Sequence, residues 1–326
     1  MTGSFRTILL VLLLGCAERP AHDRPSLLCS QPVAPLPSAA DPVSPPETPA
    51  SAEPSPTAPL PIPEEMAGVP GGQFYVGQDN IGEMDERPRH LVTVKPFLLD
   101  RTEVTHEAYY RCVEANVCRP HSSASTAANH FGDDRKFRTP TRPISGVSHE
   151  DARTYCAWVD KRLPTEVEWE RAARGNDERL YPWGNEEPTR DLAVFGGTIT
   201  QPVGSTPRGA GPYGHLDLAG NVWEWVEDHY DPYAYRRSSA DVGVPGSCDE
   251  ILATQDELRK TGQQGFTGSN PIPTECEFVL RGGAFNYGAK GLRSSNRVHH
   301  PGRFRLVMSG FRCARDWPTG PTESTE

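Results

Sequence analysis

Residues 162–175 read RLPTEVEWERAARG, and this stretch predicts a short helix with a defined start and end. Thr165 and Glu168 have the Thr-x-x-Glu spacing of a capping box, in which each side chain accepts a hydrogen bond from the other residue's backbone N–H. Gly175 follows the last apolar position, and glycine there ends a helix because it readily leaves the helical conformation. The segment therefore predicts a helix that opens at Thr165 and stops at Gly175.

The sequence before this helix predicts two strands and two further helices. Residues 71–77 and 90–99 have strand character, and Pro96 indicates an edge or a bulge in the second. Thr105 and Ser148 are suitable N-cap residues, and each precedes an apolar pattern with helical period. The chain after 175 is rich in glycine, proline and tryptophan, with few helical periods. Together these features predict an α+β domain with low regular secondary structure.

Composition limits the class of protein. The chain has 326 residues, a formal net charge of -10 and a pI near 5.5. A nucleic-acid-binding protein would carry a basic face, so we expect no nucleic-acid partner. All 6 tryptophans and all 10 tyrosines lie after residue 65. The folded part is therefore expected at 66–317, a length that can bury one large core.

The N-terminus has the pattern of an export signal. Arg6 precedes the apolar run 8–14, ILLVLLL, which is too short to span a bilayer and reads as the core of a signal peptide. The following Leu-Gly-Cys resembles a bacterial lipobox, which implies that residues 1–15 are removed and that Cys16 is lipidated. The alternative is an ordinary secretory peptide in which Cys16 has no special role. By the same resemblance, Ala17 directly after the cysteine favours the outer membrane.

Residues 16–65 are predicted to form a disordered tether. They are rich in proline and contain no aromatic residue, so they have little apolar surface to offset the entropy of ordering. Proline-rich linkers are extended spacers, and this one could hold a domain away from a membrane surface. The acidic end of the chain, 318–326, is predicted to be a disordered tail.

Five motifs in the folded part occur in a characteristic order. The chain resembles the formylglycine-generating enzymes, also called sulfatase-modifying factors, over roughly 68–316. The resemblance implies a C-type-lectin-like variant fold with low regular secondary structure. The motifs are RLPTEVEWERAARG at 162–175, YPWGN at 181–185, DLAGNVWEW at 217–225, RGG at 281–283 and GFRC at 310–313.

The resemblance also implies an activity, from which this sequence departs. Family enzymes oxidise a cysteine to formylglycine with oxygen and a copper(I) ion bound by two cysteines, and soft thiolates are what copper(I) selects. The matching positions here are Tyr287 and Leu292, and neither supplies a thiolate. The family's active-site serine is matched by Ala284. We therefore expect no copper and no classical formylglycine generation.

The cysteines of the folded part are predicted to form disulfides. An even number of cysteines in an exported domain indicates paired bridges, which would leave no free thiol for a rearranged copper site. By the resemblance, Cys156 and Cys313 match a family disulfide. Cys112 and Cys118 are close enough in sequence to bridge a turn, and the remaining pair would link the ends of a long insertion. That remaining pair is Cys248 and Cys276, and Cys29 in the tether is left over.

The resemblance implies a structural calcium site in the DLAGNVWEW segment. The matching ligands are the carboxylates of Asp217 and Glu224 and the backbone carbonyls of Gly220 and Val222. Hard oxygen ligands of this kind suit Ca²⁺. The alternative is that Glu224 pairs with a buried arginine and Asp217 caps a turn. A second family calcium site near 191–196 is in doubt, because Val194 stands where an asparagine is usual.

Other polar residues carry weaker predictions. Tandem His299 and His300 could suggest an iron site, but three spaced histidines are not found, so exposed loop histidines are expected. Trp183, Trp223 and Trp225 are expected in the core. A basic cluster near the C-terminus could line a substrate groove or pair with acidic residues, and we favour pairing. Its members are Arg281, Arg293, Arg297, Arg303, Arg305 and Arg312.

The sequence thus predicts a bacterial envelope lipoprotein that displays a formylglycine-generating-enzyme-like domain on a tether. We expect it to face the periplasm or the cell surface and to bind or assemble with an envelope protein or peptide, without copper oxidase activity. The alternative is an oxidase of the same family that acts on exported proteins or small molecules. A fold alone does not decide between them.

Overall fold

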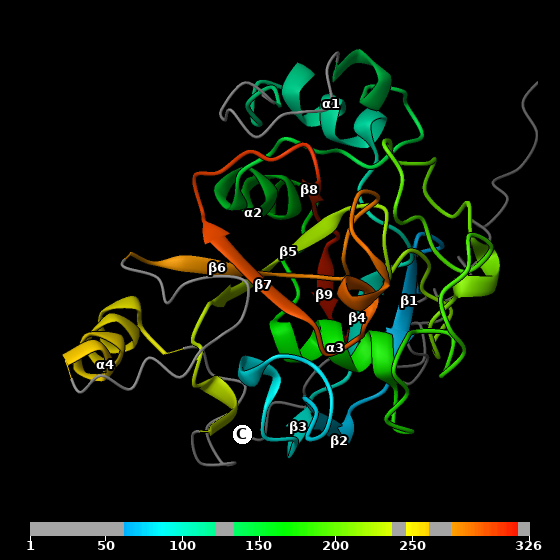
Figure 1. Ribbon diagram of the computed structural model, residues 1–326. Helices are drawn as coiled ribbons and strands as arrows, with labels where there is room; N and C mark the ends of the chain where they lie inside the picture. The colour runs from blue at the N-terminus through cyan, green and yellow to red at the C-terminus, as the bar shows by residue number, and fades with distance from the viewer. Residues whose placement is uncertain (1–61, 122–133, 237–245, 261–274, 319–326) are drawn as a thin grey trace, which may run out of the picture. The chain divides into compact units, whose positions relative to one another are not determined.

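A computed structural model describes residues 62–121, 134–236, 246–260 and 275–318 (Figure 1). The chain divides into the units Met1–Pro54 and Ser55–Glu326, and every described residue belongs to the second. The predicted signal peptide, Cys16, Cys29 and nearly all of the predicted tether and tail lie outside the described residues. In the described ranges, no helix combines the length and hydropathy needed to cross a membrane.

The strands of the described residues form three small sheets. Strand β4 lies between β1 and β9, and both neighbours are antiparallel to it. Strands β2 and β3 pair with each other, and the largest sheet has the order β7-β6-β5-β8, with β8 parallel to β5. The strands are β1 Met66–Val69, β2 Gly72–Val76, β3 His90–Val94, β4 Phe97–Asp100, β5 Trp223–His229, β6 Glu277–Arg281, β7 Arg297–Pro301, β8 Ser309–Gly310 and β9 Ala314–Asp316.

The helices begin where the sequence places their caps. The Thr105 hydroxyl accepts from the Ala108 N–H, and capping boxes open the helices after Ser148 and Thr165. The α-helices are α1 His106–Glu114, α2 His149–Trp158, α3 Glu166–Arg174 and α4 Cys248–Lys260. Short 3-10 turns are η1 Met84–Glu86, η2 Asp134–Phe137, η3 Pro207–Gly209, η4 Ala234–Arg236 and η5 Ala289–Leu292.

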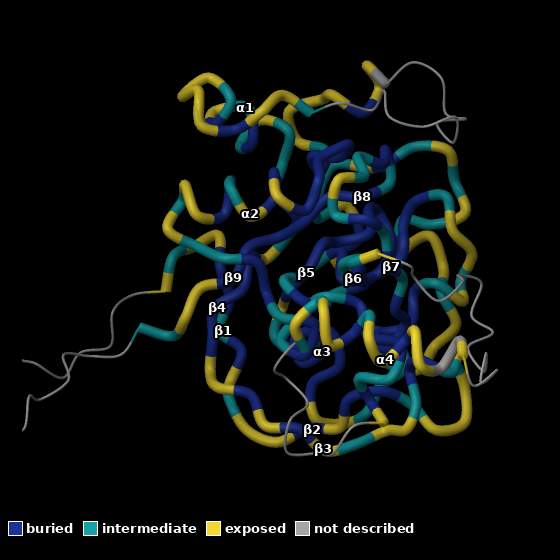
Figure 2. Tube along the Cα trace, turned by 90° about the vertical axis from the view of Figure 1, so that its left-hand side faces the viewer, coloured by how far each residue is buried: buried dark blue, intermediate teal, exposed yellow. Residues whose placement is uncertain are grey.

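The core lies on both faces of strand β5. Successive side chains of a strand point to opposite faces, and Trp225 packs in one buried cluster with Tyr155 of α2, whereas Val226 packs in another with Trp169 of α3. Helices α2 and α3 therefore cover opposite faces of β5, and the strands between them form the buried centre in Figure 2. The α+β prediction is confirmed by this arrangement.

Strand β6 ends at the RGG motif, and the two glycines of this motif lie close to η5. Gly282 and Gly283 have φ values of 96° and 82°, which disfavour residues with a side chain. A Cβ on Gly283 would lie 2.8 Å from the Gly291 carbonyl oxygen. The two glycines therefore let the chain after β6 fold back against the turn that carries Leu292.

The predicted strand at 90–99 is wrong as a single element. The chain forms β3 and β4 instead, which belong to different sheets, with Lys95 and Pro96 between them. Proline has no backbone N–H to donate to a ladder, so it marks the break between the two sheets and not an irregularity within one strand.

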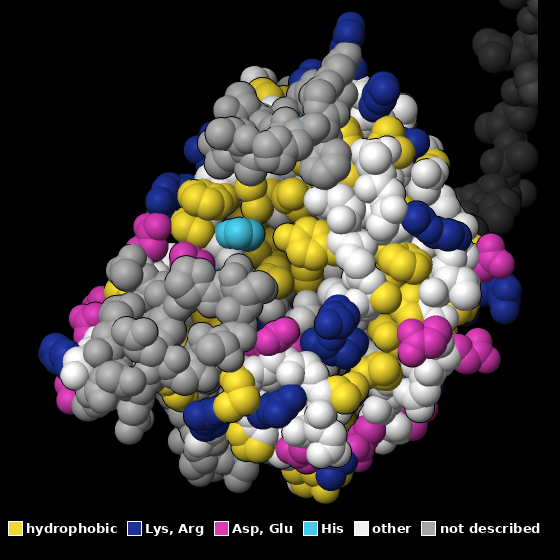
Figure 3. Space-filling model, in the orientation of Figure 1, with side chains coloured by type: hydrophobic (Ala, Val, Ile, Leu, Met, Phe, Trp, Pro, Cys, Tyr) yellow, Lys and Arg dark blue, Asp and Glu magenta, His cyan; other side chains and the backbone are white. Residues whose placement is uncertain are grey.

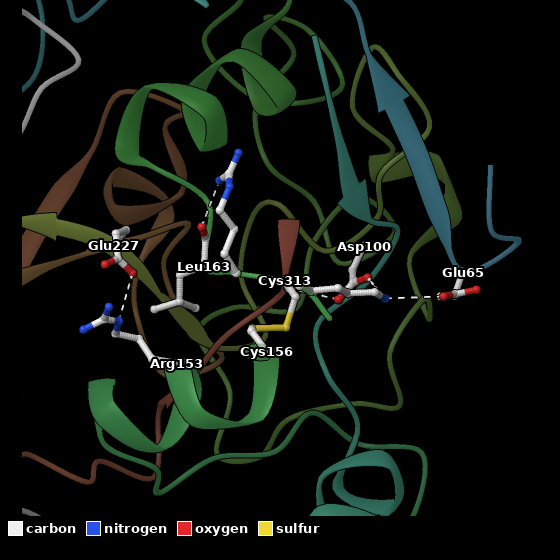
Figure 4. Close-up of a disulfide and its surroundings, with 9 residues drawn as sticks. Glu65, Asp100, Arg153, Cys156, Leu163, Glu227 and Cys313 are labelled. Carbon is white, nitrogen blue, oxygen red and sulfur yellow. Dashed lines mark hydrogen bonds and ion pairs between the residues drawn. A yellow bond between two sulfur atoms is a disulfide. The ribbon is translucent and has the colours of Figure 1, made fainter. Parts of the chain in front are cut away.

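The structure contains the three cysteine pairs that the sequence predicts. Cys156 on α2 bonds Cys313 just before β9, with Cα atoms 5.6 Å apart, and this bridge lies beside the Lys161–Asp100 ion pair (Figure 4). The other two disulfides join Cys112 to Cys118 and Cys248 to Cys276. The Cys156–Cys313 disulfide therefore links α2, in the middle of the chain, to the C-terminal part of the folded domain.

Candidate functional site

A cavity of about 450 Å³ opens between η5, β7 and the start of β5. This is within the size range of small-molecule sites, about 300–1,000 Å³. Trp223, Tyr230 and Tyr287 contribute aromatic walls, and Lys290 lies at the η5 side. Figure 3 shows hydrophobic side chains around a hollow on this face, with charged side chains along part of its border. We call this space the aromatic cleft.

The two positions matched to the copper-binding cysteines have different environments. The Tyr287 side chain is 38% exposed at the cleft, and its ring lies edge-on to Trp223 with centroids 5.2 Å apart. Leu292 is fully buried and packs with Tyr181, Ala193 and Ala219. One position therefore lines the cleft, and the other has become part of the core.

A carboxylate–histidine pair lies on the β7 side of the cleft. His299 Nδ1 hydrogen-bonds Glu277 on β6, and the imidazole ring stacks on Tyr230 with centroids 3.8 Å apart. Both His299 and His300 belong to β7, and His299 is 5% exposed, so the prediction of exposed loop histidines is wrong. Strand pairing with β6 buries His299, which the sequence pattern did not reveal.

The arginines of the C-terminal basic cluster are paired with carboxylates, which confirms the pairing prediction. Glu166 accepts from both Arg281 and Arg297, and Glu170 also accepts from Arg281. Burial raises the pKa of Glu166, but the two guanidiniums outweigh this effect and hold the pKa below its ordinary value. The remaining pairs are Arg293 with Glu86, Arg303 with Glu275, Arg305 with Asp151 and Arg312 with Glu224.

The backbone of the DLAGNVWEW loop is tightly turned. Asp217, Gly220 and Asn221 all have positive φ, at 57°, 89° and 59°. The Asp217 carboxylate accepts from the Gly204 N–H at 2.5 Å, as the turn-capping alternative predicts. The Val194 carbonyl accepts from the Asn221 N–H, so it holds this loop in place.

Glu224 is buried and already has strong partners. Its carboxylate accepts from Arg312 Nε at 2.7 Å and Nη2 at 2.8 Å, and from the indole N–H of Trp169 at 2.9 Å. Arg312 also donates to the carbonyls of Asp100, Arg101 and Leu216. The buried-arginine alternative for Glu224 is therefore present in the structure.

A third carboxyl group, which the sequence did not single out, adds negative charge beside these two. Glu103 is 2% exposed, and its carboxyl group lies beside that of Asp217. Burial, followed by the nearby Asp217, raises the pKa of Glu103 well above its ordinary value. Three carboxyl groups thus face the single guanidinium of Arg312, and either bound protons or a cation would relieve the excess negative charge.

Side chains alone do not assemble a metal site in the part of the chain that the structure describes. No group of three or more His, Cys, Asp or Glu side chains there is arranged to hold an ion. The calcium site implied by the sequence draws half of its ligands from backbone carbonyls. The residues present supply the donor type and the negative charge that calcium needs.

Comparison with known proteins gives one consistent family. The model of the sulfatase-modifying factor enzyme 1-like domain matches residues 51–317. The formylglycine-generating enzyme of Thermomonospora curvata is 33% identical over 315 residues, covering 79% of this chain and 96% of that protein. The inactive C-alpha-formylglycine-generating enzyme 2 of Bos taurus is 36% identical over 214 residues, covering 51% of this chain and 71% of that protein.

Other matches concern longer proteins or the fold. The chain is 34% identical over 269 residues to serine/threonine-protein kinase pkn1 of Chlamydia caviae, covering 79% of this chain but only 39% of that protein. The solved structure of PvdO from Pseudomonas aeruginosa has a TM-score of 0.56 and 26% identity, covering 77% of this chain and 94% of that one. Treponema denticola variable protein 1 has a TM-score of 0.52 and 22% identity, covering 78% of this chain and 95% of that one. The predicted C-type-lectin-like fold is confirmed by these two structural neighbours.

Proposed function

This chain belongs to the sulfatase-modifying factor enzyme 1-like family, and on that premise we propose that it is a binding protein that lacks the family's copper oxidase activity. The aromatic cleft, in the place of the family's catalytic cleft, is the binding site. The protein is exported and anchored to the bacterial envelope through Cys16, and it acts by binding an envelope component or assembling with one.

The observation that carries this proposal is the replacement of both copper-binding cysteines. Tyr287 and Leu292 cannot provide thiolates, and Leu292 is packed into the core. The six cysteines of the folded part are all consumed by disulfides, so no other thiol pair is free to take over. The Bos taurus relative, whose name describes it as inactive, shows that this family includes proteins without the activity.

Copper binding and peptide turnover test the first part of the proposal. The full-length protein, purified in detergent, is incubated with copper(I) and a sulfatase-type cysteine peptide, with the Thermomonospora curvata enzyme as the positive control. We expect no stoichiometric copper by metal analysis and no formylglycine by mass spectrometry. Turnover by this protein would support the alternative, an oxidase acting through a different centre.

Lipidation tests the second part. Cys16→Ser removes the acceptor thiol, so we expect the protein to leave the detergent phase in phase partition or to accumulate as an uncleaved precursor. A Cys29→Ser variant is the matched control and should behave as the parent. Unchanged maturation and partition of Cys16→Ser would contradict the anchor. Two or more acyl chains are needed for stable anchoring, which a lipidated N-terminal cysteine provides.

We also propose that the DLAGNVWEW loop holds a structural calcium ion. Asp217 and Glu224 would supply carboxylate oxygens, and Gly220 and Val222 would supply carbonyls. Support comes from the positive-φ backbone of the loop and from the surplus of buried carboxyl groups over Arg312. A bound calcium would neutralise that surplus and fix the loop that leads into β5.

A further inference from the structure

A second cavity, of about 690 Å³, lies along the outer face of helix α2 and shares no lining residue with the aromatic cleft. Glu150, Arg153 and Ala157 recur in it at three- and four-residue spacing, which places them on one side of the helix, and Trp158 follows beside Ala157. Val117, at the end of the α1 region, also contributes to the lining and is 47% exposed. We call this space the α2 groove.

Trp158 presents a large apolar surface to the solvent in this groove. It is 39% exposed, whereas the other five tryptophans of the chain are buried or half-buried. Tyr155 supports its ring from the core, with centroids 6.0 Å apart. Exposed apolar surface that is bordered by polar residues marks interaction sites, and tryptophan is enriched among the residues that dominate binding. The exposed indole therefore indicates a binding surface.

The charged side chains of the groove are almost all paired. Arg153 on α2 bonds Glu227 on β5 at 3.3 Å (Figure 4), and both Lys161 and Arg162 are paired with carboxylates outside the groove. Among the described residues, Glu150 is the one charged group of the groove without an ion pair. Since each cation already has a carboxylate partner, the groove disfavours phosphate groups and anionic lipids, and it favours a ligand without negative charge.

The donor and acceptor atoms of the groove match neighbouring hydroxyl groups. Arg153 can only donate and Glu227 can only accept, and their side chains are 52% and 36% exposed, so both retain atoms for a ligand. A sugar hydroxyl both donates and accepts, so two adjacent hydroxyls can bond this pair without a change in charge. The C–H face of a sugar ring would pack on the Trp158 indole. Arg153 and Trp158 are about 7.5 Å apart along the helix axis, so a chain of linked rings reaches both.

We propose that the α2 groove binds the glycan chain of the bacterial cell wall. The 45 residues between Cys16 and Ile62, the first described residue, would span up to about 140 Å when extended. Glu65, three residues after Ile62, contacts Lys161 of the groove at 3.4 Å. A groove tethered in this way reaches well beyond a membrane surface. The choice of the cell wall as the source of the glycan rests on the proposed export and anchoring of the chain.

Sedimentation with purified peptidoglycan sacculi tests the proposal on the full-length protein in detergent. We expect the protein to sediment with sacculi that have been treated with protease, and not to bind cross-linked dextran beads, whose glucose chains lack the linkage and acetamido groups of the wall. Absence of sedimentation, or equal binding to dextran, would overturn the proposal. Sedimentation with untreated sacculi alone would also overturn it, since a protein of the wall would then occupy the groove.

Variants assign the binding to the groove. Trp158→Ala removes the exposed indole and should weaken binding about tenfold or more. Ala157→Arg fills the groove from an exposed position without removing a core contact, and arginine is a good helix former, so it should cause a similar loss in a folded protein. Tyr75→Ala is the matched control, because Tyr75 is also 39% exposed but lies on β2 and should leave binding unchanged. Unchanged binding by Ala157→Arg would overturn the proposal even if Trp158→Ala does not fold.

A further variant separates this inference from the proposed function. Loss of binding in Tyr287→Ala, with binding retained in the two groove variants, would place the glycan in the aromatic cleft and overturn the role of the groove. The phase partition of Cys16→Ser does not depend on any glycan. A failure of the anchor and a failure of the groove are therefore distinguishable.

Discussion

Calcium should stabilise the folded protein against heat through Glu224. The proposed ligands, the Asp217 and Glu224 carboxylates and the carbonyls of the positive-φ loop, would meet only in the folded chain, so calcium would bind the native state selectively. A ligand of this kind stabilises by about 2.7 kcal/mol at a hundredfold excess over its dissociation constant. For a domain of this size, each kcal/mol raises the melting temperature by about 2–4 °C, so we expect a rise of about 5–10 °C.

The assay is thermal unfolding with disulfides intact, first in chelator and then with increasing calcium. Glu224→Gln should abolish the rise, and it should also lower the starting melting temperature because Arg312 loses its buried partner. The rise with calcium, and not the absolute temperature, is therefore the diagnostic quantity. Glu227→Gln, on the same strand and 36% exposed, is the matched control and should keep the full rise. A melting temperature that does not change with calcium, or a rise that survives in Glu224→Gln, would refute this reasoning.

Two further predictions concern stability. Burial, followed by the nearby Glu166, raises the pKa of Asp228 to about 8, whereas an unfolded aspartate ionises near pH 4. The folded state therefore keeps this proton to higher pH, and the stability that the protonated Asp228 contributes should be lost between about pH 4 and 8. Asp228→Asn should make the melting temperature fall less steeply over this pH range. Equal slopes of melting temperature against pH in the parent and the variant would argue against this role. Arg281→Met removes one of the two guanidiniums that pair with each of the buried carboxylates Glu166 and Glu170, and should cost about 3–5 kcal/mol in urea unfolding. Arg303→Met, whose side chain is 65% exposed, should cost less than about 1 kcal/mol, and similar losses in both variants would contradict the importance of burial.

The helix starts could be predicted from the sequence because their causes are local. Thr105, Ser148 and Thr165 each accept from a backbone N–H three residues later, and that bond depends on sequence spacing alone. The family motifs extended the prediction to the fold, and Tyr287 and Leu292 could be placed within it by their distance from the RGG motif. Local chemistry and the ordered motifs were therefore sufficient to predict the helix starts, the fold and the positions of Tyr287 and Leu292.

The remaining features depend on contacts between distant parts of the chain. Glu103 lies more than a hundred residues before Asp217, and no pattern in the sequence places it beside the DLAGNVWEW loop. His299 looked like an exposed loop residue, because its burial depends on pairing with β6 and on stacking against Tyr230. The pairing of residues 90–99 into two sheets likewise depends on partners, β2 for one half and β1 and β9 for the other.

The position of β4 between β1 and β9 has a consequence for the time at which the protein can fold. Its two neighbours come from opposite ends of the folded part, so the sheet stays incomplete until residues 314–316 are available. Chains are synthesised from the N-terminus, and contacts between distant segments form late. Strand β1 can pair with β4 early, but the other edge of β4 stays unpaired until nearly the whole domain has followed it.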